Sequence, residues 1–148
     1  MTILPISMTL AAIAALINLW LMIRCGRART KEKVMVGDGG NEAVIRRMRA
    51  HSNYIESTAF VLILIILIEL AVGPASWLWA VGGVYFAGRI AHAIGMDGVM
   101  NARFAGTLIT LLTQLGLAVM AIATVYLTPI EVQTDAGLAA NAEVVAPQ

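Results

Sequence analysis

Residues 53–72 read NYIESTAFVLILIILIELAV, an almost continuous run of apolar side chains that is dense in isoleucine and leucine. A helix needs about 20 mostly apolar residues to cross the hydrocarbon core of a bilayer. The run therefore predicts a membrane-spanning helix. Three further segments are similarly apolar, at about residues 3–23, 77–96 and 104–127. Helices are expected throughout, because isolated strands cannot satisfy their backbone groups in lipid.

The composition of the whole chain indicates the same class of protein. Hydrophobic residues make up 59% of the 148 residues and charged residues 13%, whereas soluble domains contain about 45–50% apolar and about 25% charged residues. These values exclude a disordered chain, a nucleic-acid-binding protein and an ordinary soluble enzyme. The single cysteine, Cys25, excludes an internal disulfide, and no cluster of soft ligands indicates a metal site. We expect an all-α membrane protein, with a four-helix bundle over residues 1–129 and a flexible tail over residues 130–148.

Basic residues are concentrated between the first two predicted spans. The positive-inside rule places such a segment, here residues 24–49, in the cytoplasm. Four spans then place both chain ends on the opposite side of the membrane. Eight of the ten basic residues belong to this segment: Arg24, Arg27, Arg29, Lys31, Lys33, Arg46, Arg47 and Arg49.

Turn-forming residues mark the ends of the predicted spans. Residues 37–41, Gly-Asp-Gly-Gly-Asn, form a turn that ends the loop part of the basic segment. Asn41 is a candidate N-cap for a helix that begins near Glu42 and continues into the second span. Gly73-Pro74 ends that span, and Trp77 follows at the expected membrane interface.

Two polar stripes are expected at one membrane depth. Arg49, Asn53 and Glu56 follow one another at helical spacing on the second predicted helix, and Arg89 and His92 do so on the third. Ionisable groups in a membrane usually face a bundle interior or a wet cavity. The simplest packing brings the two stripes together and pairs Glu56 with Arg89 or with a neighbouring arginine.

Two interpretations of these stripes remain open. The groups could form inter-helix pairs that only fix the register of the bundle. Alternatively, they could bind a ligand, because Arg49, Arg89 and Arg103 outnumber Glu56. An excess of arginines in a low-dielectric site requires an anion, and a carboxylate-bearing ligand would supply it.

Other polar or small residues in the spans have simpler interpretations. Glu69 lies near the outer end of the second span, where we expect its carboxylate to be solvated or hydrogen-bonded. Asn18 is expected to form a helix–helix hydrogen bond. Ala87, Ala91 and Gly95 form a stripe of small residues that allows close approach of another helix, from this chain or another subunit.

The sequence resembles the MAPEG family, the membrane-associated proteins in eicosanoid and glutathione metabolism. Its most specific element is the pattern Arg-Ala-His-x-Asn-x-x-Glu at residues 49–56, which follows the Gly-Asp-Gly-Gly-Asn segment. Residues 88–92 resemble the Gly-Arg-x-x-His element of the third span, and Arg103 followed by Gly106 resembles the start of the fourth. The resemblance covers about residues 1–127 and is greatest to bacterial members. It implies a homotrimer with glutathione bound between subunits at the cytoplasmic side. In the bacterial inner membrane, the topology given by the positive-inside rule makes both termini periplasmic.

The resemblance also implies roles for individual residues. Arg103 would lie near the glutathione sulfur and favour the thiolate, which makes it the catalytic candidate. Glu56 would face the amino group of the peptide. An arginine from the first helix of the adjacent subunit is also expected. The candidates for glutathione binding are Arg49, Asn53, Glu56, Arg89, His92 and, from the first helix, Arg24 or Arg27.

The implied activity is a glutathione transferase or peroxidase reaction with a hydrophobic electrophile that arrives from the membrane. Met96 and Thr107 stand where eicosanoid-forming members carry tyrosines. This departure favours an alternative, a non-catalytic membrane protein of the same fold that binds a lipid or a partner complex. A small transporter subunit, with Glu56 and His92 as a proton relay, is the least favoured, because the ionisable residues cluster on one side.

Overall fold

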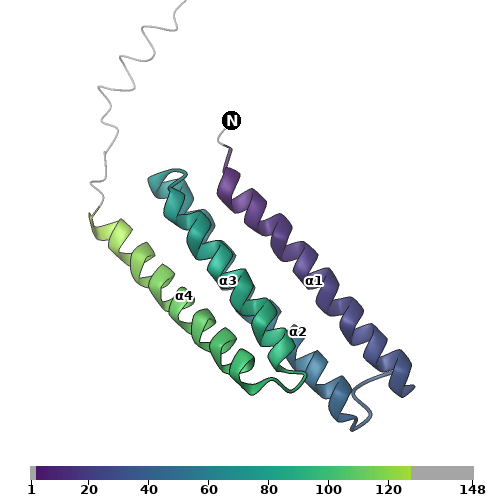
Figure 1. Ribbon diagram of the computed structural model, residues 1–148. Helices are drawn as coiled ribbons and strands as arrows, with labels where there is room; N and C mark the ends of the chain where they lie inside the picture. The colour runs from purple at the N-terminus through teal and green to yellow at the C-terminus, as the bar shows by residue number, and fades with distance from the viewer. Residues whose placement is uncertain (1–2, 128–148) are drawn as a thin grey trace, which may run out of the picture.

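The computed structural model describes residues 3–127 as four helices joined by short connections (Figure 1). These are α1 (Pro5–Glu32), α2 (Glu42–Val72), α3 (Ser76–Gly95) and α4 (Met100–Leu127). The predicted all-α, four-helix architecture is confirmed. The tail predicted at residues 130–148, together with residues 1–2 and 128–129, lies outside the described residues.

Three of these helices, α1, α2 and α4, are long and apolar enough to cross a membrane. The segment predicted as a further span at residues 77–96 is helical but is not among the three. It has 20 residues, and they include Arg89, His92 and several glycines, which lower its mean hydropathy. α3 nevertheless runs alongside the other helices (Figure 1), so its charged and polar groups lie inside the bundle.

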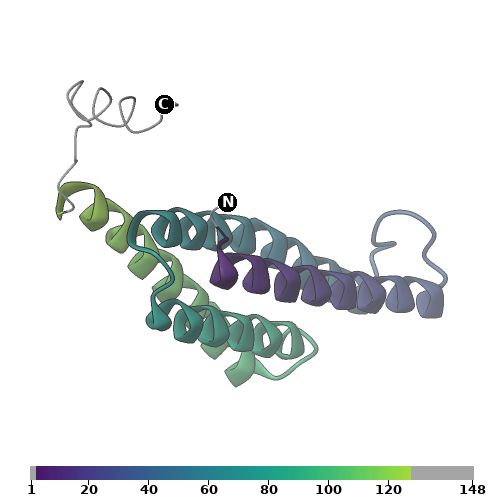
Figure 2. The same cartoon turned by 90° about the horizontal axis from the view of Figure 1, so that it is seen from above.

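The bundle consists of two antiparallel helix pairs (Figure 2). α1 packs mainly on α2, and α3 packs mainly on α4. α3 and α4 approach each other closely: a Cβ on Gly106 would overlap the carbonyl oxygen of Gly88 and the backbone nitrogen of His92. A Cβ on Gly95 would likewise overlap the backbone of Arg103. Glycine is therefore required where the start of α4 crosses the end of α3.

α1 is longer than the predicted span. The sequence suggested that its helix ends near residue 23 and that the basic segment is a loop, but the helix continues to Glu32. No glycine turn or proline interrupts this stretch until Lys33 adopts the left-handed conformation, with φ 57°. Arg29 and Lys31 lie in the last turn, where positive charge is favourable beside the helix dipole.

The predicted boundaries of α2 are confirmed. The side chain of Asn41 accepts hydrogen bonds from the backbone N–H groups of Ala43 at 3.0 Å and Val44 at 3.2 Å, and so caps the helix. At the other end, Gly73 has φ 81° and its N–H donates to the Glu69 carbonyl oxygen. This positive φ value favours glycine.

Glu69 joins the beginning of α1 to the end of α2. Its side chain is 1% exposed and accepts hydrogen bonds from the backbone N–H of Ile6 at 3.0 Å, the N–H of Ser7 at 2.7 Å and the Ser7 hydroxyl. These N–H groups have no partner within their own helix, and negative charge is favourable at a helix N-terminus. The expectation of a hydrogen-bonded carboxylate is confirmed, whereas the alternative of a solvated one is wrong. We call this arrangement the Glu69 clamp.

A second polar contact joins the same two helices near the middle of the bundle. The Nε2 atom of His51 lies 2.8 Å from the Oδ1 atom of Asn18. The helix–helix hydrogen bond predicted for Asn18 is therefore confirmed.

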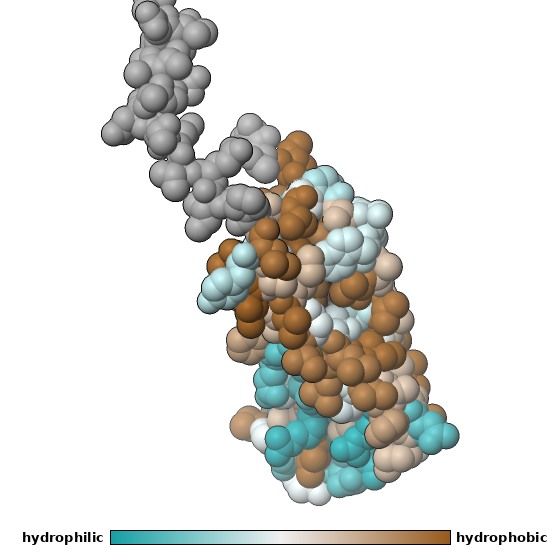
Figure 3. Space-filling view, turned by 90° about the vertical axis from the view of Figure 1, so that its left-hand side faces the viewer, coloured by the Kyte–Doolittle hydropathy of each residue, from teal (hydrophilic) through white to brown (hydrophobic). Residues whose placement is uncertain are grey.

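The two ends of the bundle differ in polarity. Hydrophilic residues gather at the end that carries the α1–α2 and α3–α4 connections, and hydrophobic residues cover most of the remainder of the visible face (Figure 3). The start of α1 and the end of α4 lie at the opposite end (Figure 1). The candidate site residues belong to the hydrophilic end.

Candidate functional site

A cavity of about 190 Å³ lies between α2, α3 and the start of α4. Five residues that the sequence singled out line it together, although they come from three different helices. The expectation that the polar stripes of the second and third helices meet is therefore confirmed. The lining consists of Arg49, Ser52, Asn53, Glu56, His92, Met96 and Arg103.

The cavity carries an excess of positive charge. Arg49 and Arg103 contribute two guanidinium groups, and Glu56 contributes the one carboxylate among the described lining residues. All three side chains are exposed in the protomer. Within residues 3–127 Glu56 forms no salt bridge. The carboxylate is therefore free to face a cationic group of a ligand, while the arginines face anionic groups.

An adjoining hollow of about 370 Å³ shares Arg49, Met96 and Arg103 with this cavity. It extends towards the hydrophilic end of the bundle, where Glu42 and Arg46 line it and form an ion pair at 2.8 Å. The cavity therefore connects to the polar end of the molecule, from which a charged, water-soluble ligand can enter.

Arg89 lies behind the cavity and does not line it. Its side chain is 1% exposed, and its guanidinium donates to Asn53 Oδ1 at 2.9 Å and to Thr110 Oγ1 at 3.1 Å. The expected Glu56–Arg89 ion pair is not formed. Helical spacing placed the two residues at one depth, but Arg89 points into the interface between α2 and α4, where its partners are neutral.

Two tyrosines near the site are buried in the core of the bundle. Tyr85 is fully buried and makes hydrogen bonds with Thr58 at 2.9 Å and Ser57 at 3.1 Å. The hydroxyl of Tyr54 donates to the carbonyl oxygen of Ala14 at 2.7 Å. Both hydroxyls are thus used in helix packing, and neither residue lines the cavity.

A model of the MAPEG family matches residues 7–123, which include most of α1 and α4, all of α2 and α3, and every lining residue of the cavity. The chain belongs to the MAPEG family. Comparison with curated proteins finds no match. Membership makes the chain a membrane protein of a family in glutathione and eicosanoid metabolism and confirms the resemblance on which the site prediction rests.

The cavity shows where this MAPEG protein departs from the eicosanoid-forming pattern. Met96 lines the cavity with a thioether, where a tyrosine would contribute a hydroxyl. Thr107 is exposed, and its hydroxyl donates back to the carbonyl oxygen of Arg103 at 2.9 Å. At these two positions the cavity therefore offers a ligand no tyrosine hydroxyl.

The two candidate arginines of α1 lie outside the cavity of their own protomer. Arg24 forms an ion pair with Asp97, donates to the carbonyl oxygen of Ala93 at 3.2 Å and stacks over the Trp20 ring at 4.7 Å. Arg27 is exposed on α1. A contribution of either arginine to the cavity of a neighbouring subunit stays a prediction.

Asp97 is a structural residue that sequence reasoning did not identify. Its carboxylate accepts from Arg24 and, at 3.4 Å, from Arg47, and so ties α1 and α2 to the connection between α3 and α4. The exposed position of Asp97 in a short loop after Met96 carries no periodic signal, because its partners come from distant parts of the chain.

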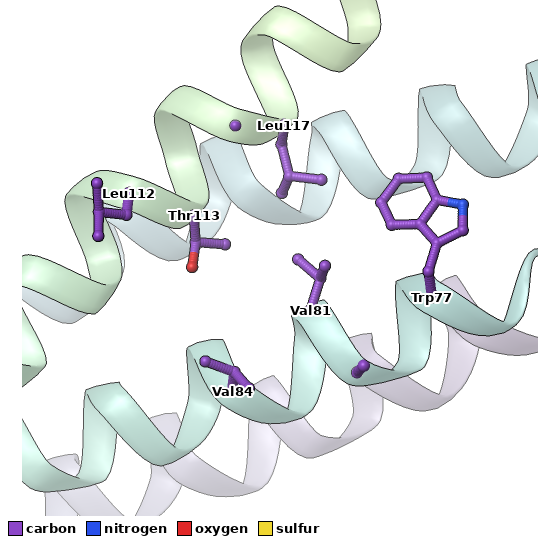
Figure 4. Close-up of a pocket in the computed structure, with 8 residues that line it drawn as sticks. Trp77, Val81, Val84, Leu112, Thr113 and Leu117 are labelled. Carbon is purple, nitrogen blue, oxygen red and sulfur yellow. The ribbon is translucent and has the colours of Figure 1, made fainter.

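An apolar groove of about 380 Å³ lies between α3 and α4 at some distance from the polar cavity. Trp77, Val81 and Val84 of α3 face Leu112, Thr113 and Leu117 of α4 across it (Figure 4). Val84 precedes His92 by about two helical turns, or about 12 Å of rise along α3. The groove is therefore separate from the charged cavity.

Proposed function

We propose that the protein is an integral membrane transferase or peroxidase that uses glutathione and acts on a hydrophobic electrophile. One observation carries the proposal: a single cavity brings together two arginines, one carboxylate and one amide in a chain of the MAPEG family. Glutathione bears two carboxylates, an ammonium group and a thiol, and this set of groups is complementary to the lining.

In the proposed complex, Arg49 and Asn53 hold the carboxylates of the peptide and Glu56 faces its ammonium group. His92 contributes to the same wall, and Arg103 lies beside the sulfur. A thiol has an ordinary pKa of about 8.5, and a neighbouring guanidinium lowers the pKa and so increases the thiolate fraction at neutral pH.

The thiolate then reacts with an electrophile that enters from the bilayer. In a transferase reaction the sulfur forms a bond to carbon, and the bond to the leaving group breaks with its electron pair. In a peroxidase reaction two glutathione molecules reduce one hydroperoxide to an alcohol and water and become the disulfide. Apolar surfaces would select the second substrate by bulk hydrophobicity, which discriminates weakly.

The proposal includes a homotrimer in the bacterial inner membrane, with the hydrophilic end in the cytoplasm and both chain ends in the periplasm. The cavity residues Arg49, Glu56 and Arg103 are exposed in the protomer, which is consistent with a site that a neighbouring subunit completes. Arg24 or Arg27 of that subunit would supply a further cation.

Calorimetric titration of glutathione into the detergent-purified full chain tests the proposal. We expect binding in the micromolar-to-millimolar range, and about 10- to 100-fold weaker binding in the Arg103→Ala variant, because a hydrogen bond to a charged group contributes about 1.5–3 kcal/mol. Lys31→Ala is the control, since it removes an equal charge from an exposed site on α1 outside the cavity.

A parent protein that binds no glutathione at several millimolar would refute the enzyme proposal. Together with the replacement of two tyrosines by Met96 and Thr107, this result would favour a non-catalytic MAPEG protein. Lipid or partner protein that copurifies in the cavity would be the result expected of that alternative.

A further inference from the structure

We infer that Arg89 is a positioning residue: it turns the Asn53 side chain so that only its NH₂ group faces the cavity, and it makes this part of the site selective for anions. The inference rests on the proposed ligand site but concerns a residue that does not line it. It predicts that this wall of the cavity presents hydrogen-bond donors, and not acceptors, to a ligand.

The orientation of Asn53 follows from the chemistry of its partner. A guanidinium has five N–H donors and no acceptor, so the Asn53 atom that lies 2.9 Å from Arg89 Nη2 must be its carbonyl oxygen. The NH₂ group of the amide is then the part of the side chain left to face the cavity that Asn53 lines. Asn53 can therefore donate to a ligand atom from its NH₂ group, while its carbonyl oxygen is turned towards Arg89.

Thr110 is fixed in the same network. Its hydroxyl donates to the carbonyl oxygen of Gly106 at 2.8 Å, so it accepts from Arg89 Nη1 at 3.1 Å with its lone pairs. The direction of every hydrogen bond from Gly106 to Asn53 is thus determined. Rotation of the Asn53 amide would place its NH₂ group against the guanidinium, donor against donor.

The charge of Arg89 is not balanced within the protomer. The guanidinium is 1% exposed, its Nε atom has no hydrogen-bond partner within residues 3–127, and no salt bridge of that region includes it. A buried cation in a low-dielectric region strongly favours a nearby anion. The cavity beyond Asn53 is accessible to such an anion, and we assign to it a carboxylate group of the ligand.

Two matched substitutions test the inference without any ligand of uncertain identity. Asn53→Asp introduces a carboxylate beside Arg89, whereas Ser52→Asp introduces the same charge into the same cavity one residue away. Both lie about one helical turn before Glu56, so repulsion from that carboxylate is similar. We expect Asn53→Asp to raise the melting temperature by a few degrees relative to Ser52→Asp, because only the former gives Arg89 a counter-ion.

Sulfate serves as the probe anion in a thermal-shift titration at constant ionic strength made up with chloride. We expect sulfate to raise the melting temperature of the parent chain, and this rise to fall by more than half in Asn53→Asp and by less in Ser52→Asp. Arg89→Lys should retain part of the response and Arg89→Gln should lose it. The inference is wrong if sulfate has no effect on the parent, or if the two aspartate variants behave alike in stability and in response.

Glutathione titration separates this inference from the proposed function. If Arg89 acts through Asn53, then Arg89→Gln weakens glutathione binding about tenfold, and the double variant with Asn53→Ala binds no more weakly than Asn53→Ala alone. Additive losses would show that Arg89 contacts the ligand directly, which contradicts the positioning role. A sulfate response without any glutathione binding would refute only the proposed function.

Discussion

Tyr85 and Arg103 illustrate how differently two polar side chains of one small bundle can be used. The hydroxyl of Tyr85 is buried against Thr58 and Ser57, whereas Arg103 lines the cavity and is exposed. We expect Tyr85→Phe to lower the free energy of unfolding by about 1 kcal/mol and to leave glutathione binding unchanged. Arg103→Ala should weaken glutathione binding and leave the free energy of unfolding nearly unchanged. Chemical denaturation and calorimetry on both variants measure the two effects; a loss of binding in Tyr85→Phe would contradict the assignment of Tyr85 to the core.

The Glu69 clamp provides a second test at the level of one side chain. Glu69→Gln replaces a carboxylate that accepts from Ile6 and Ser7 with an amide, whose NH₂ group must face an N–H donor. We expect a loss of at least about 2 kcal/mol in stability, because hydrogen bonds to charged groups contribute about 1.5–3 kcal/mol.

Ser7→Ala is the matched control for the clamp, since it removes the hydroxyl and keeps both backbone donors. Its loss should be smaller, about 1.5 kcal/mol, which is the lower end of the range for a hydrogen bond to a charged group, measured by the same denaturation experiment in detergent. Equal losses in the two variants would show that the charge of Glu69 contributes nothing.

The sequence predicted only part of the candidate site. Helical spacing placed Arg49, Asn53 and Glu56 on one face, and the structure confirms that this face meets His92 in a cavity. Spacing says nothing about how far each helix is rotated against its neighbour. For that reason the sequence could not identify Asn53 as the partner of Arg89. It also could not show that Glu69 accepts hydrogen bonds from the start of α1.

At the level of helices, glycines allow the tight contact between α3 and α4. Gly106→Ala would force a Cβ into the backbone of α3, so we expect a loss of about 1–3 kcal/mol from overpacking. The shift would also disturb Thr110 and Arg89, and glutathione binding should weaken. Denaturation and calorimetry measure the two effects.

Gly116→Ala on the same helix is the control for this contact. A Cβ there meets nothing within 4 Å, so the substitution should be tolerated or should stabilise α4 by up to about 1 kcal/mol through helix propensity. If the Gly106 and Gly116 variants were equally stable, the close approach of α3 and α4 would not be needed.

The helices themselves were largely predictable. Apolar run length located all four, and local chemistry located the Asn41 cap and the Gly73 stop, because both depend on neighbours in the chain. The end of α1 was misjudged, since hydropathy marks where a helix leaves the lipid and not where its hydrogen bonds end. α1 continues to Glu32 as a polar helix.

At the level of the whole molecule, the distribution of charge predicts its orientation. In a Cys25→Ser background, Lys31→Cys places a thiol at the hydrophilic end and Ser76→Cys places one at the opposite end; both positions are exposed. We expect a membrane-impermeant maleimide to label the Ser76 variant in spheroplasts, and the Lys31 variant only after lysis. The opposite pattern would invert the proposed topology.

Assembly is also a property of the whole molecule. Exposed hydrophobic side chains run along α4, among them Leu108, Leu111, Leu115 and Val119, and lipid or neighbouring subunits must cover them. Native mass spectrometry from detergent should detect three copies of the chain. A monomer that binds glutathione as tightly as the parent preparation would contradict a site shared between subunits.

The Glu69 clamp has a consequence for how the chain is made. In the proposed topology α2 carries this carboxylate across the apolar interior of the membrane, and the carboxylate then accepts hydrogen bonds from the N–H groups of Ile6 and Ser7. An α1 that has not yet inserted leaves Glu69 without these partners. The α1–α2 hairpin is therefore stabilised only when the start of α1 reaches the end of α2. If α1 is misplaced in the membrane, the Glu69 carboxylate is left in lipid without hydrogen-bond donors.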